Sequence, residues 1–200
     1  MRNPLTVGVF CGILGGVMEK EDNIRHGLTA CRSVYMNVDT GEKTWLTPKY
    51  IVDALGPFDL DPCCPDGGMP WTTAKRMVTK SEDVLSVDWT GCRVWMNPPY
   101  GRESAPFFEK MSHHVSGGGS GIAFVFARTD TAVWHDLVFQ NARALLFIRG
   151  RVRFFRRDGS VGDSAPTPSV LIGFSDYDSE RLREASDTGA IKGYYVRALK

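Results

Sequence analysis

The chain has 200 residues, of which 42% are hydrophobic and 24% are charged, a composition that is typical of one folded domain and excludes a disordered chain. Its 24 Lys and Arg residues nearly balance its 23 Asp and Glu residues, so the overall charge does not point to a nucleic-acid partner. The positive charge is concentrated locally, because residues 141–160 contain six Arg and one Asp. The five cysteines include no C-x-x-C pair, which predicts reduced thiols in a cytoplasmic protein.

The first 40 residues show no clear periodicity and are interpreted as an N-terminal extension to a domain over residues 41–200. Their longest apolar run, Leu5–Met18, has 14 residues, whereas a membrane span needs about 20. Charged residues separate this run from Leu28–Cys31, which faintly resembles a lipoprotein cleavage site, so export is not expected. We therefore expect no contact with a membrane.

The next segments alternate between helical and strand patterns. Thr47-Pro48 and Gly56-Pro57 predict a helix over 49–55 with Thr47 as its N-cap. A second helix is predicted over 131–140, and strands are predicted over 58–61, 93–96, 122–127, 144–148, 151–155 and 169–174. The unbroken apolar run 122–127 is typical of a central parallel strand. This order predicts an α/β sheet, mostly parallel, with antiparallel C-terminal strands.

The most distinctive motif is Asn97-Pro98-Pro99-Tyr100, which follows the predicted strand 93–96. Ligands of open α/β sheets bind at the carboxyl ends of the strands. The Asn97 amide offers an oxygen acceptor, the two prolines hold the Pro98 carbonyl in a nearly fixed direction, and Tyr100 adds a flat ring. The plain alternative is a turn that only ends the strand, or a short polyproline ligand.

Two fixed acceptors beside a ring suit a planar group that carries an –NH2, such as adenine or an amide side chain. When both N–H bonds point at acceptors, the nitrogen lone pair can turn toward an electrophilic methyl group, such as that of S-adenosylmethionine. The fixed oxygen dipoles then stabilise the positive charge that develops on nitrogen. The motif therefore predicts N-methylation without a general base.

The chain resembles the phage-type, Dam-like DNA N-6-adenine methyltransferases. The resemblance covers about residues 44–174 and rests on motifs in the family's order: Thr44-Trp45-Leu46-Thr47-Pro48, Phe58-Asp59-Leu60-Asp61-Pro62-Cys63, Asp88-Trp89, Val94-Trp95-Met96-Asn97-Pro98-Pro99-Tyr100-Gly101, Ala127-Arg128-Thr129-Asp130-Thr131 and Arg149-Gly150-Arg151-Val152-Arg153-Phe154. It implies a single-domain, Rossmann-like methyltransferase sheet, S-adenosylmethionine as cofactor and DNA as partner. It also implies that Asn97, Pro98, Pro99 and Tyr100 are catalytic, with Tyr100 stacking on an adenine swung out of the duplex. Many relatives carry Asp at the first position, and Asn keeps the acceptor without the charge.

The resemblance also implies the cofactor-binding residues. It makes Asp61 the residue near the methionine end of the cofactor, beside Pro62 and Cys63, with Thr47-Pro48 as the other wall. Whether Asp59 or Asp61 makes the contact stays open, and Asp83 is a weaker candidate for the adenine or ribose. For each carboxylate the alternative is a helix cap or a solvated loop. The usual glycine-rich turn after this strand is replaced by Cys63–Gly68, which leaves the contacts there unassigned.

The arginine-rich segment 149–157 is the best candidate for DNA contact. Arg151 and Arg153 are expected to share one face of a strand, with Arg149 and Arg156 close by, and guanidinium groups in that arrangement suit phosphate oxygens. Arg128 follows the central strand and is a further candidate, although capping by its neighbours explains that segment equally well. A charged edge strand that resists aggregation is the alternative for 151–155.

No metal site is expected, because His113-His114 has no Cys or carboxylate at ligand spacing and is interpreted as a solvated pair. Two alternatives to DNA adenine methylation remain. Protein glutamine-amide methyltransferases also use Asn-Pro-Pro-Tyr, but normally with a Gly-x-Gly loop that this chain lacks, and a catalytically inactive DNA-binding relative is the other. The chain offers no separate recognition domain, only the segment between Asp61-Pro62 and Asn97 and the loops near 101–120 and 155–168. Neither the residues that read bases, nor the recognition sequence, nor the oligomeric state is predicted.

Overall fold

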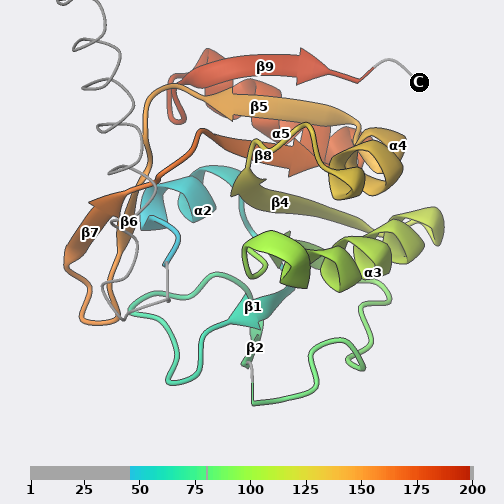
Figure 1. Cartoon of the computed structure of the whole chain (residues 1–200), viewed down its shortest axis with the longest axis horizontal. Coiled ribbons are helices and arrows are strands. Elements are labelled where there is room, and N and C mark those ends of the chain that lie inside the picture. The colour runs from blue at the N-terminus through green and yellow to red at the C-terminus, as the bar shows by residue number, and fades with distance from the viewer. Residues whose placement is uncertain (1–45, 80, 199–200) are drawn as a thin grey trace, which may run out of the picture. The chain divides into compact units, whose positions relative to one another are not determined.

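The computed structural model describes residues 46–79 and 81–198, and within them seven strands form one sheet in the order β2-β1-β3-β4-β8-β5-β9 (Figure 1). The sheet strands are β1 (Leu60–Cys64), β2 (Arg76–Thr79), β3 (Arg93–Met96), β4 (Ser120–Phe126), β5 (Ala144–Ile148), β8 (Ser169–Gly173) and β9 (Gly193–Arg197), and β6 (Arg153–Phe155) pairs with β7 (Val161–Ser164) in a separate hairpin. The helices are α2 (Lys49–Leu55), α3 (Ala105–Ser116), α4 (Phe139–Asn141) and α5 (Asp176–Asp187), together with a 3-10 turn, η1 (Gly101–Ser104), and a π-helical turn, η2 (Val133–Val138).

Strand direction divides the sheet into two parts. The neighbours among β2, β1, β3 and β4 are parallel, whereas β8 is antiparallel to both β4 and β5, and β9 is antiparallel to β5. The first five strands of the chain therefore point the same way, and β8 and β9 point the other way. The expected α/β class with antiparallel C-terminal strands is confirmed.

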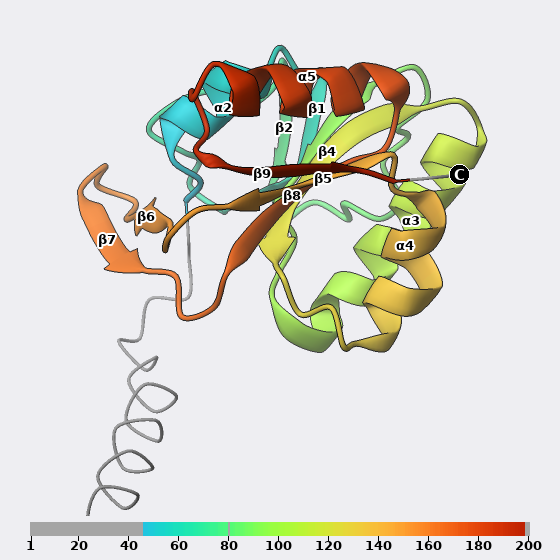
Figure 2. The ribbon, with the colours of Figure 1, turned by 90° about the horizontal axis from the view of Figure 1, so that it is seen from above.

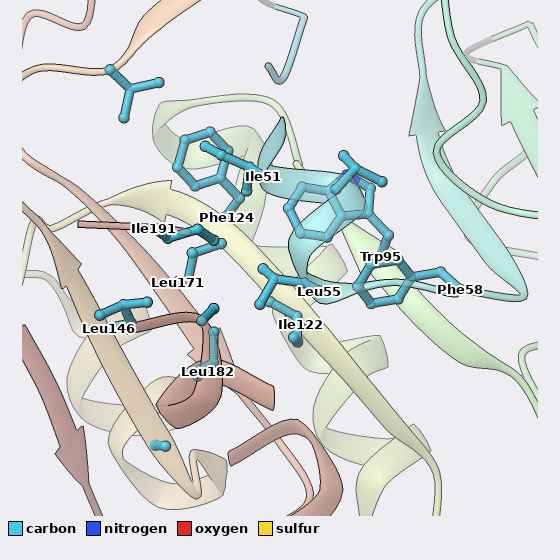
Figure 3. Close-up of a cluster of buried hydrophobic side chains, with 14 of the residues drawn as sticks. Ile51, Leu55, Phe58, Trp95, Ile122, Phe124, Leu146, Leu171, Leu182 and Ile191 are labelled. Carbon is cyan, nitrogen blue, oxygen red and sulfur yellow. The ribbon is translucent and has the colours of Figure 1, made fainter. Parts of the chain in front are cut away.

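Helices cover both faces of this sheet, with α2 and α5 on one face and α3 and α4 on the other (Figure 2). The side chains of β4 alternate between the two cores, so that Ile122 and Phe124 pack with α2 and α5 while Ala123 and Val125 pack with α3. Figure 3 shows the first core, in which Trp95 and Phe58 lie beside Leu55 of α2. Burial on both faces explains why the sequence of β4 is apolar without interruption.

A buried ion pair fixes the amino end of β3. The Nε of Arg93 lies 2.8 Å from a carboxylate oxygen of Asp178 in α5, and the guanidinium also donates to the carbonyl oxygens of Leu55 and Pro57. The second carboxylate oxygen of Asp178 accepts from the Gly121 N–H at 2.8 Å. One ion pair therefore connects β3, β4, α2 and α5 at the edge opposite the strand ends that carry the candidate site.

Several expected elements need correction. Pro48, not Thr47, is the N-cap of α2, and no side chain caps this helix. The strand expected over 58–61 runs instead through Pro62 to Cys64, and its register with β2 shifts between Asp61 and Cys64 because Pro62 has no N–H to donate. The expected loop near 101–120 is mostly α3, and the expected helix over 131–140 is η2 followed by α4.

The arginine-rich segment also differs from its prediction. The strand expected over 151–155 begins only at Arg153, so Arg151 lies outside it, and β6 pairs with β7 rather than with the main sheet. The hairpin lies at the edge where β4 and β5 end (Figures 1 and 2). It is held there by the buried side chain of Phe154 and by two backbone hydrogen bonds between Leu46 and Phe155.

The N-terminal extension, the apolar run Leu5–Met18 and the motif residues Thr44 and Trp45 lie outside the described residues, so the domain boundary near residue 40 stays a prediction. In the ranges that the structure describes, no helix combines the length and the apolar character that a membrane crossing requires.

Candidate functional site

The side chain of Asn97 is held by hydrogen bonds at the carboxyl end of β3. Its Nδ2 donates to the Thr47 hydroxyl at 3.1 Å, and its Oδ1 accepts from the Tyr100 hydroxyl at 3.3 Å. Thr47 accepts one of the two amide N–H bonds, and the amide oxygen is directed toward Tyr100. An amide oxygen has two lone pairs and can therefore accept two hydrogen bonds. Thr47 therefore orients Asn97 instead of capping α2.

Tyr100 lies in an aromatic cluster that fixes its ring. One face is stacked on Phe126, with ring centroids 4.0 Å apart and planes 7° apart, and Phe154 meets the ring edge-on at 6.4 Å. Burial raises the pKa of the Tyr100 phenol above its ordinary value, so the hydroxyl keeps its proton and serves as a donor. Phe126 covers one face of the ring, so a planar ligand cannot stack on that face.

Backbone geometry turns the chain sharply after this ring. Pro98 is buried and Pro99 is exposed, and both fix φ. Gly101 then takes φ of +89°, a conformation that strains residues with a Cβ, and η1 follows at once. The motif therefore sits between a rigid strand end and a turn that suits glycine.

A buried carboxylate lies at the carboxyl end of β1, the strand next to β3. Asp61 is 2% exposed, and it accepts hydrogen bonds from the Thr73 hydroxyl and, at 2.9 Å, from the Cys63 N–H. Burial raises the pKa of Asp61 to about 6, although these two hydrogen bonds lower it. Among the residues that the structure describes, no Lys, Arg or His forms an ion pair with Asp61. A buried carboxylate that lacks a cation suits a positively charged ligand.

Cys63 connects the Asp61 and Asn97 groups. Burial and the nearby Asp61 carboxylate raise the pKa of the Cys63 thiol well above its ordinary value, and a backbone hydrogen bond with Asn97 opposes this rise. The thiol is therefore protonated at neutral pH and is not a nucleophile. The ends of β1 and β3 and the residues before α2 thus gather Thr47, Pro48, Asp61, Pro62, Cys63, Asn97 and Tyr100 in one region.

Two of the expected cofactor residues lie elsewhere. Asp59 precedes β1, where its carboxylate forms an ion pair with Lys75 at 2.8 Å and accepts from the Arg93 N–H at the amino end of β3. The hydrogen bond with Lys75 lowers the pKa of Asp59. Asp83 is exposed on the loop between β2 and β3, and no hydrogen bond links it to Asp61 or Asn97. Of the two carboxylates left open by the sequence, only Asp61 lies at the edge of the sheet that carries Asn97.

The candidate DNA-binding arginines are exposed at this same edge. Because β3, β4 and β5 run in one direction, Arg128 after β4 and Arg149 after β5 lie at the edge where Asn97 follows β3. Arg151 and Arg153 are exposed around the start of the hairpin. The fifth, Arg156, donates to the Val161 carbonyl across the hairpin at 3.2 Å.

Sequence reasoning missed two residues of this region, Thr73 and Phe126. Thr73 lies in a loop and reaches Asp61 only through the fold, so no local pattern marks it. Phe126 ends the apolar run of β4, and its position beside the ring of Tyr100 follows from the parallel pairing of β3 with β4. The expected parallel pairing of these two strands is the signal from which the position of Phe126 could have been predicted.

A hollow of about 550 Å³ lies between α3 and the loop before β3, and none of the predicted site residues lines it. The expectation that His113-His114 is a solvated pair is wrong for His114, whose Nε2 lies 3.1 Å from the Cys92 carbonyl oxygen and whose ring meets Trp89 edge-on. Among the described residues, no group of three or more His, Cys, Asp or Glu side chains could hold a metal ion.

Comparisons with known proteins cover most of the chain. The family model described as DNA N-6-adenine-methyltransferase (Dam) matches residues 36–188. The chain is similar to a DNA N-6-adenine-methyltransferase of Haemophilus phage HP1 (strain HP1c1), with 28% identity over 159 residues, which are 76% of this chain and 85% of the relative. No solved structure matches the chain at a significant level.

Proposed function

Because the chain belongs to the family of DNA N-6-adenine-methyltransferases (Dam), we propose that it transfers a methyl group from S-adenosylmethionine to the N6 amino group of adenine in DNA. The observation that carries this proposal is the orientation of Asn97 by Thr47 and Tyr100 at the end of β3. Thr47 accepts one N–H of the amide in this orientation, and we propose that the amide oxygen receives the incoming –NH2 group.

Asn97 acts by positioning and by charge stabilisation. The adenine amine donates one N–H to Oδ1 of Asn97 and a second to the Pro98 carbonyl, which turns the nitrogen lone pair out of the ring plane. As nitrogen bonds to the methyl carbon and the carbon–sulfur bond breaks, positive charge moves onto nitrogen, where the two oxygen dipoles stabilise it. The surplus N–H proton then leaves to solvent, because Asn97 has no basic group.

Tyr100 receives the base. Inside a duplex the N6 amine is paired and cannot approach Asn97, so the adenine has to leave the helix. The face of Tyr100 that Phe126 does not cover stacks on the extruded ring. Since Phe126 and Phe154 already hold the phenol ring, little conformational freedom is lost when the adenine binds.

The residues around Asp61 fit a cationic cofactor. S-adenosylmethionine supplies an electrophilic methyl group on a sulfonium centre and also carries an ammonium group. Asp61, buried and without an ion-pair partner among the described residues, is the carboxylate that would hold such a cation, with Thr47, Pro48, Pro62 and Cys63 beside it. Asp59 is engaged with Lys75, and we leave it out of the proposed site.

The DNA backbone is proposed to lie across the carboxyl edge of the sheet. Arg128, Arg149, Arg151 and Arg153 are exposed there, and Arg156 lies next to them on the hairpin. Guanidinium groups bind phosphate oxygens without regard to sequence, so this set positions the duplex over Asn97. An enzyme of this kind acts where DNA is accessible, which is the cytoplasm of a bacterial cell.

The experiment that tests the proposal is methylation of genomic DNA that lacks N6-methyladenine. The purified full chain is incubated with this DNA and S-adenosylmethionine that carries a labelled methyl group, and modified bases are mapped by sequencing. We expect label at adenine N6 with the wild type and none with Asn97→Ala. Label in protein glutamine instead of DNA, or cofactor-independent DNA binding without transfer, contradicts the proposal.

A further inference from the structure

A second hollow, of about 330 Å³, lies beside the hairpin and is not explained by methyl transfer. It is lined by Tyr50 of α2, by Arg149, Arg151 and Arg153, and by apolar side chains that include Ile148 and Phe155. We call it the arginine hollow.

The charge of the arginine hollow favours an anion. None of its lining residues is acidic. In the part of the chain that the structure describes, none of the three arginines forms an ion pair, whereas Arg93, Arg181, Arg183 and Arg197 each do. Three guanidinium groups around one hollow match the geometry of phosphate oxygens.

The other lining residues favour more than a bare phosphate. Tyr50 is 52% exposed, so its ring is accessible at the mouth of the hollow. Phe155 is fixed from behind, because Trp71 meets its ring edge-on at 5.2 Å and Leu46 pairs with its backbone. Aromatic rings and apolar walls next to guanidinium groups form a surface on which bases stack while phosphates bind the cations.

We propose that the arginine hollow binds an unpaired nucleotide, with its phosphate on the arginines and its base on Tyr50. This inference rests on the proposed function for the identity of the strand, which is the DNA strand near the target adenine. It adds a subsite that holds a second base outside the helix.

The position of the hollow relative to Asn97 follows from the sheet. Three strand spacings separate β3 from β5 in the order β3-β4-β8-β5, which amounts to about 14 Å. Ile148, at the end of β5, packs on the same core cluster as Phe126 and Tyr100, so the hollow and the Tyr100 ring lie on one face of the sheet. Tyr50 follows Thr47 by three residues, and Thr47 contacts Asn97, so the held nucleotide lies near the target adenine.

The test measures binding of a single-stranded oligodeoxynucleotide of about 12 nucleotides and mixed sequence, with the matching blunt duplex as the second probe. Tyr50→Ala should weaken single-strand binding about five-fold or more, and Tyr50→Phe should restore it, because stacking needs the ring and not the hydroxyl. In the duplex the base has to be unpaired before it can reach Tyr50, so the affinity for the duplex should fall less than the affinity for the single strand. Tyr194→Ala is the matched control, since Tyr194 is 75% exposed, lies on β9 and does not line the hollow.

The salt dependence of binding distinguishes the phosphate contacts of the arginines from the stacking of the base on Tyr50. For the single strand, Arg151→Ala should reduce the slope of log affinity against log salt by about 0.7, the value for one lost phosphate contact. Tyr50→Ala should lower the affinity without changing that slope. Equal effects of Tyr50→Ala on the strand and the duplex, or no effect on either, overturn the subsite.

The outcome is distinguishable from failure of the proposed function. If the protein methylates adenine in DNA but Tyr50→Ala binds single strands like the wild type, the subsite is wrong and the methyltransferase assignment stands. If no methyl transfer occurs but single-strand binding depends on Tyr50, the subsite stands as a nucleotide site and the methyltransferase assignment is wrong.

Discussion

The phenol ring of Tyr100 lies flat on Phe126, with their centroids 4.0 Å apart, while its hydroxyl donates to the amide oxygen of Asn97. The last residue of β4 thereby determines where the ring after β3 can lie. The stacking of the Tyr100 ring is thus coupled to its hydrogen bond with the Asn97 amide oxygen, and the two proposed functions of Tyr100 can be separated by mutation.

Tyr100→Phe removes the hydroxyl and keeps the ring, so we expect kcat/KM for DNA methylation to fall about ten-fold, the effect of one hydrogen bond. Tyr100→Ala also removes the stacking surface and should abolish measurable transfer. Steady-state kinetics with labelled cofactor provide the measurement. Equal activities of the Phe and Ala variants indicate that the ring has no part in binding the base.

Thr47→Val leaves the Nδ2 of Asn97 without its acceptor while keeping the size of the side chain. We expect kcat to fall by about ten-fold, because the amide can then rotate and offer its N–H in place of its oxygen. Thr47→Ser retains the hydroxyl and should be close to the wild type. If Thr47→Val has full activity, Thr47 does not orient Asn97.

Asp61 predicts a pH dependence of cofactor binding. With a pKa of about 6, the carboxyl is largely neutral near pH 5 and charged near pH 7.5. The affinity for the cationic S-adenosylmethionine should therefore rise across this range, by up to about ten-fold between pH 5 and pH 7.5. Calorimetric titration at each pH measures it. In Asp61→Asn the affinity should be low and nearly independent of pH, and an unchanged pH profile in this variant excludes Asp61 as the cause.

The Asp61 carboxylate also predicts how the stability of the fold depends on pH. This dependence has the opposite sign to that of cofactor affinity. A folded-state pKa of about 6, against an ordinary 3.8, means that the folded protein binds this proton more tightly than the unfolded chain. Its contribution to stability is therefore present at low pH and is lost as the pH rises from about 4 to 6, at a cost of up to about 3 kcal/mol. Asp61→Asn should raise the free energy of unfolding at pH 8 and have little effect near pH 4, as urea denaturation can show. Destabilisation at pH 8 contradicts this account.

Breaking the Arg93–Asp178 ion pair should lower the stability of the fold without changing the affinity for the cofactor. Removing the carboxylate in Asp178→Ala leaves the Arg93 guanidinium, 8% exposed, without its counter-charge, and should cost about 3–5 kcal/mol of unfolding free energy. Because this pair is at the amino end of β3, the folded fraction should keep its affinity for the cofactor. If the folded variant loses affinity for the cofactor, the amino edge of the sheet at Arg93 is coupled to the carboxyl edge that carries the candidate site.

Local patterns predicted the elements that surround the site. The apolar run of β4, the strand before Asn97 and the helix α2 all follow from residues next to one another in sequence. The missed helices also carried local signals. In α3, Phe107, Phe108, Met111 and Val115 follow a helical period, and α5 begins with the Ser175 and Asp178 capping box.

Contacts between distant residues could not be predicted from such patterns. Thr47 precedes a helix, as an N-cap does, yet its hydroxyl is used by Asn97, 50 positions later. Asp61 reaches Thr73 across a loop, and Asp59 forms its ion pair at the opposite edge of the sheet. Thr47 and Asp59 differ from their predicted roles because a contact with a distant residue outweighs the local preference.

The central claim is that the oriented amide oxygen of Asn97 drives methyl transfer to adenine, and the direct measurement is single-turnover transfer of labelled methyl to DNA by Asn97→Ala. With cofactor and DNA both bound to saturation, we expect the rate to fall by at least about 100-fold, while the affinity for S-adenosylmethionine stays within about two-fold of the wild type. A variant that transfers methyl groups at the wild-type rate contradicts the claim.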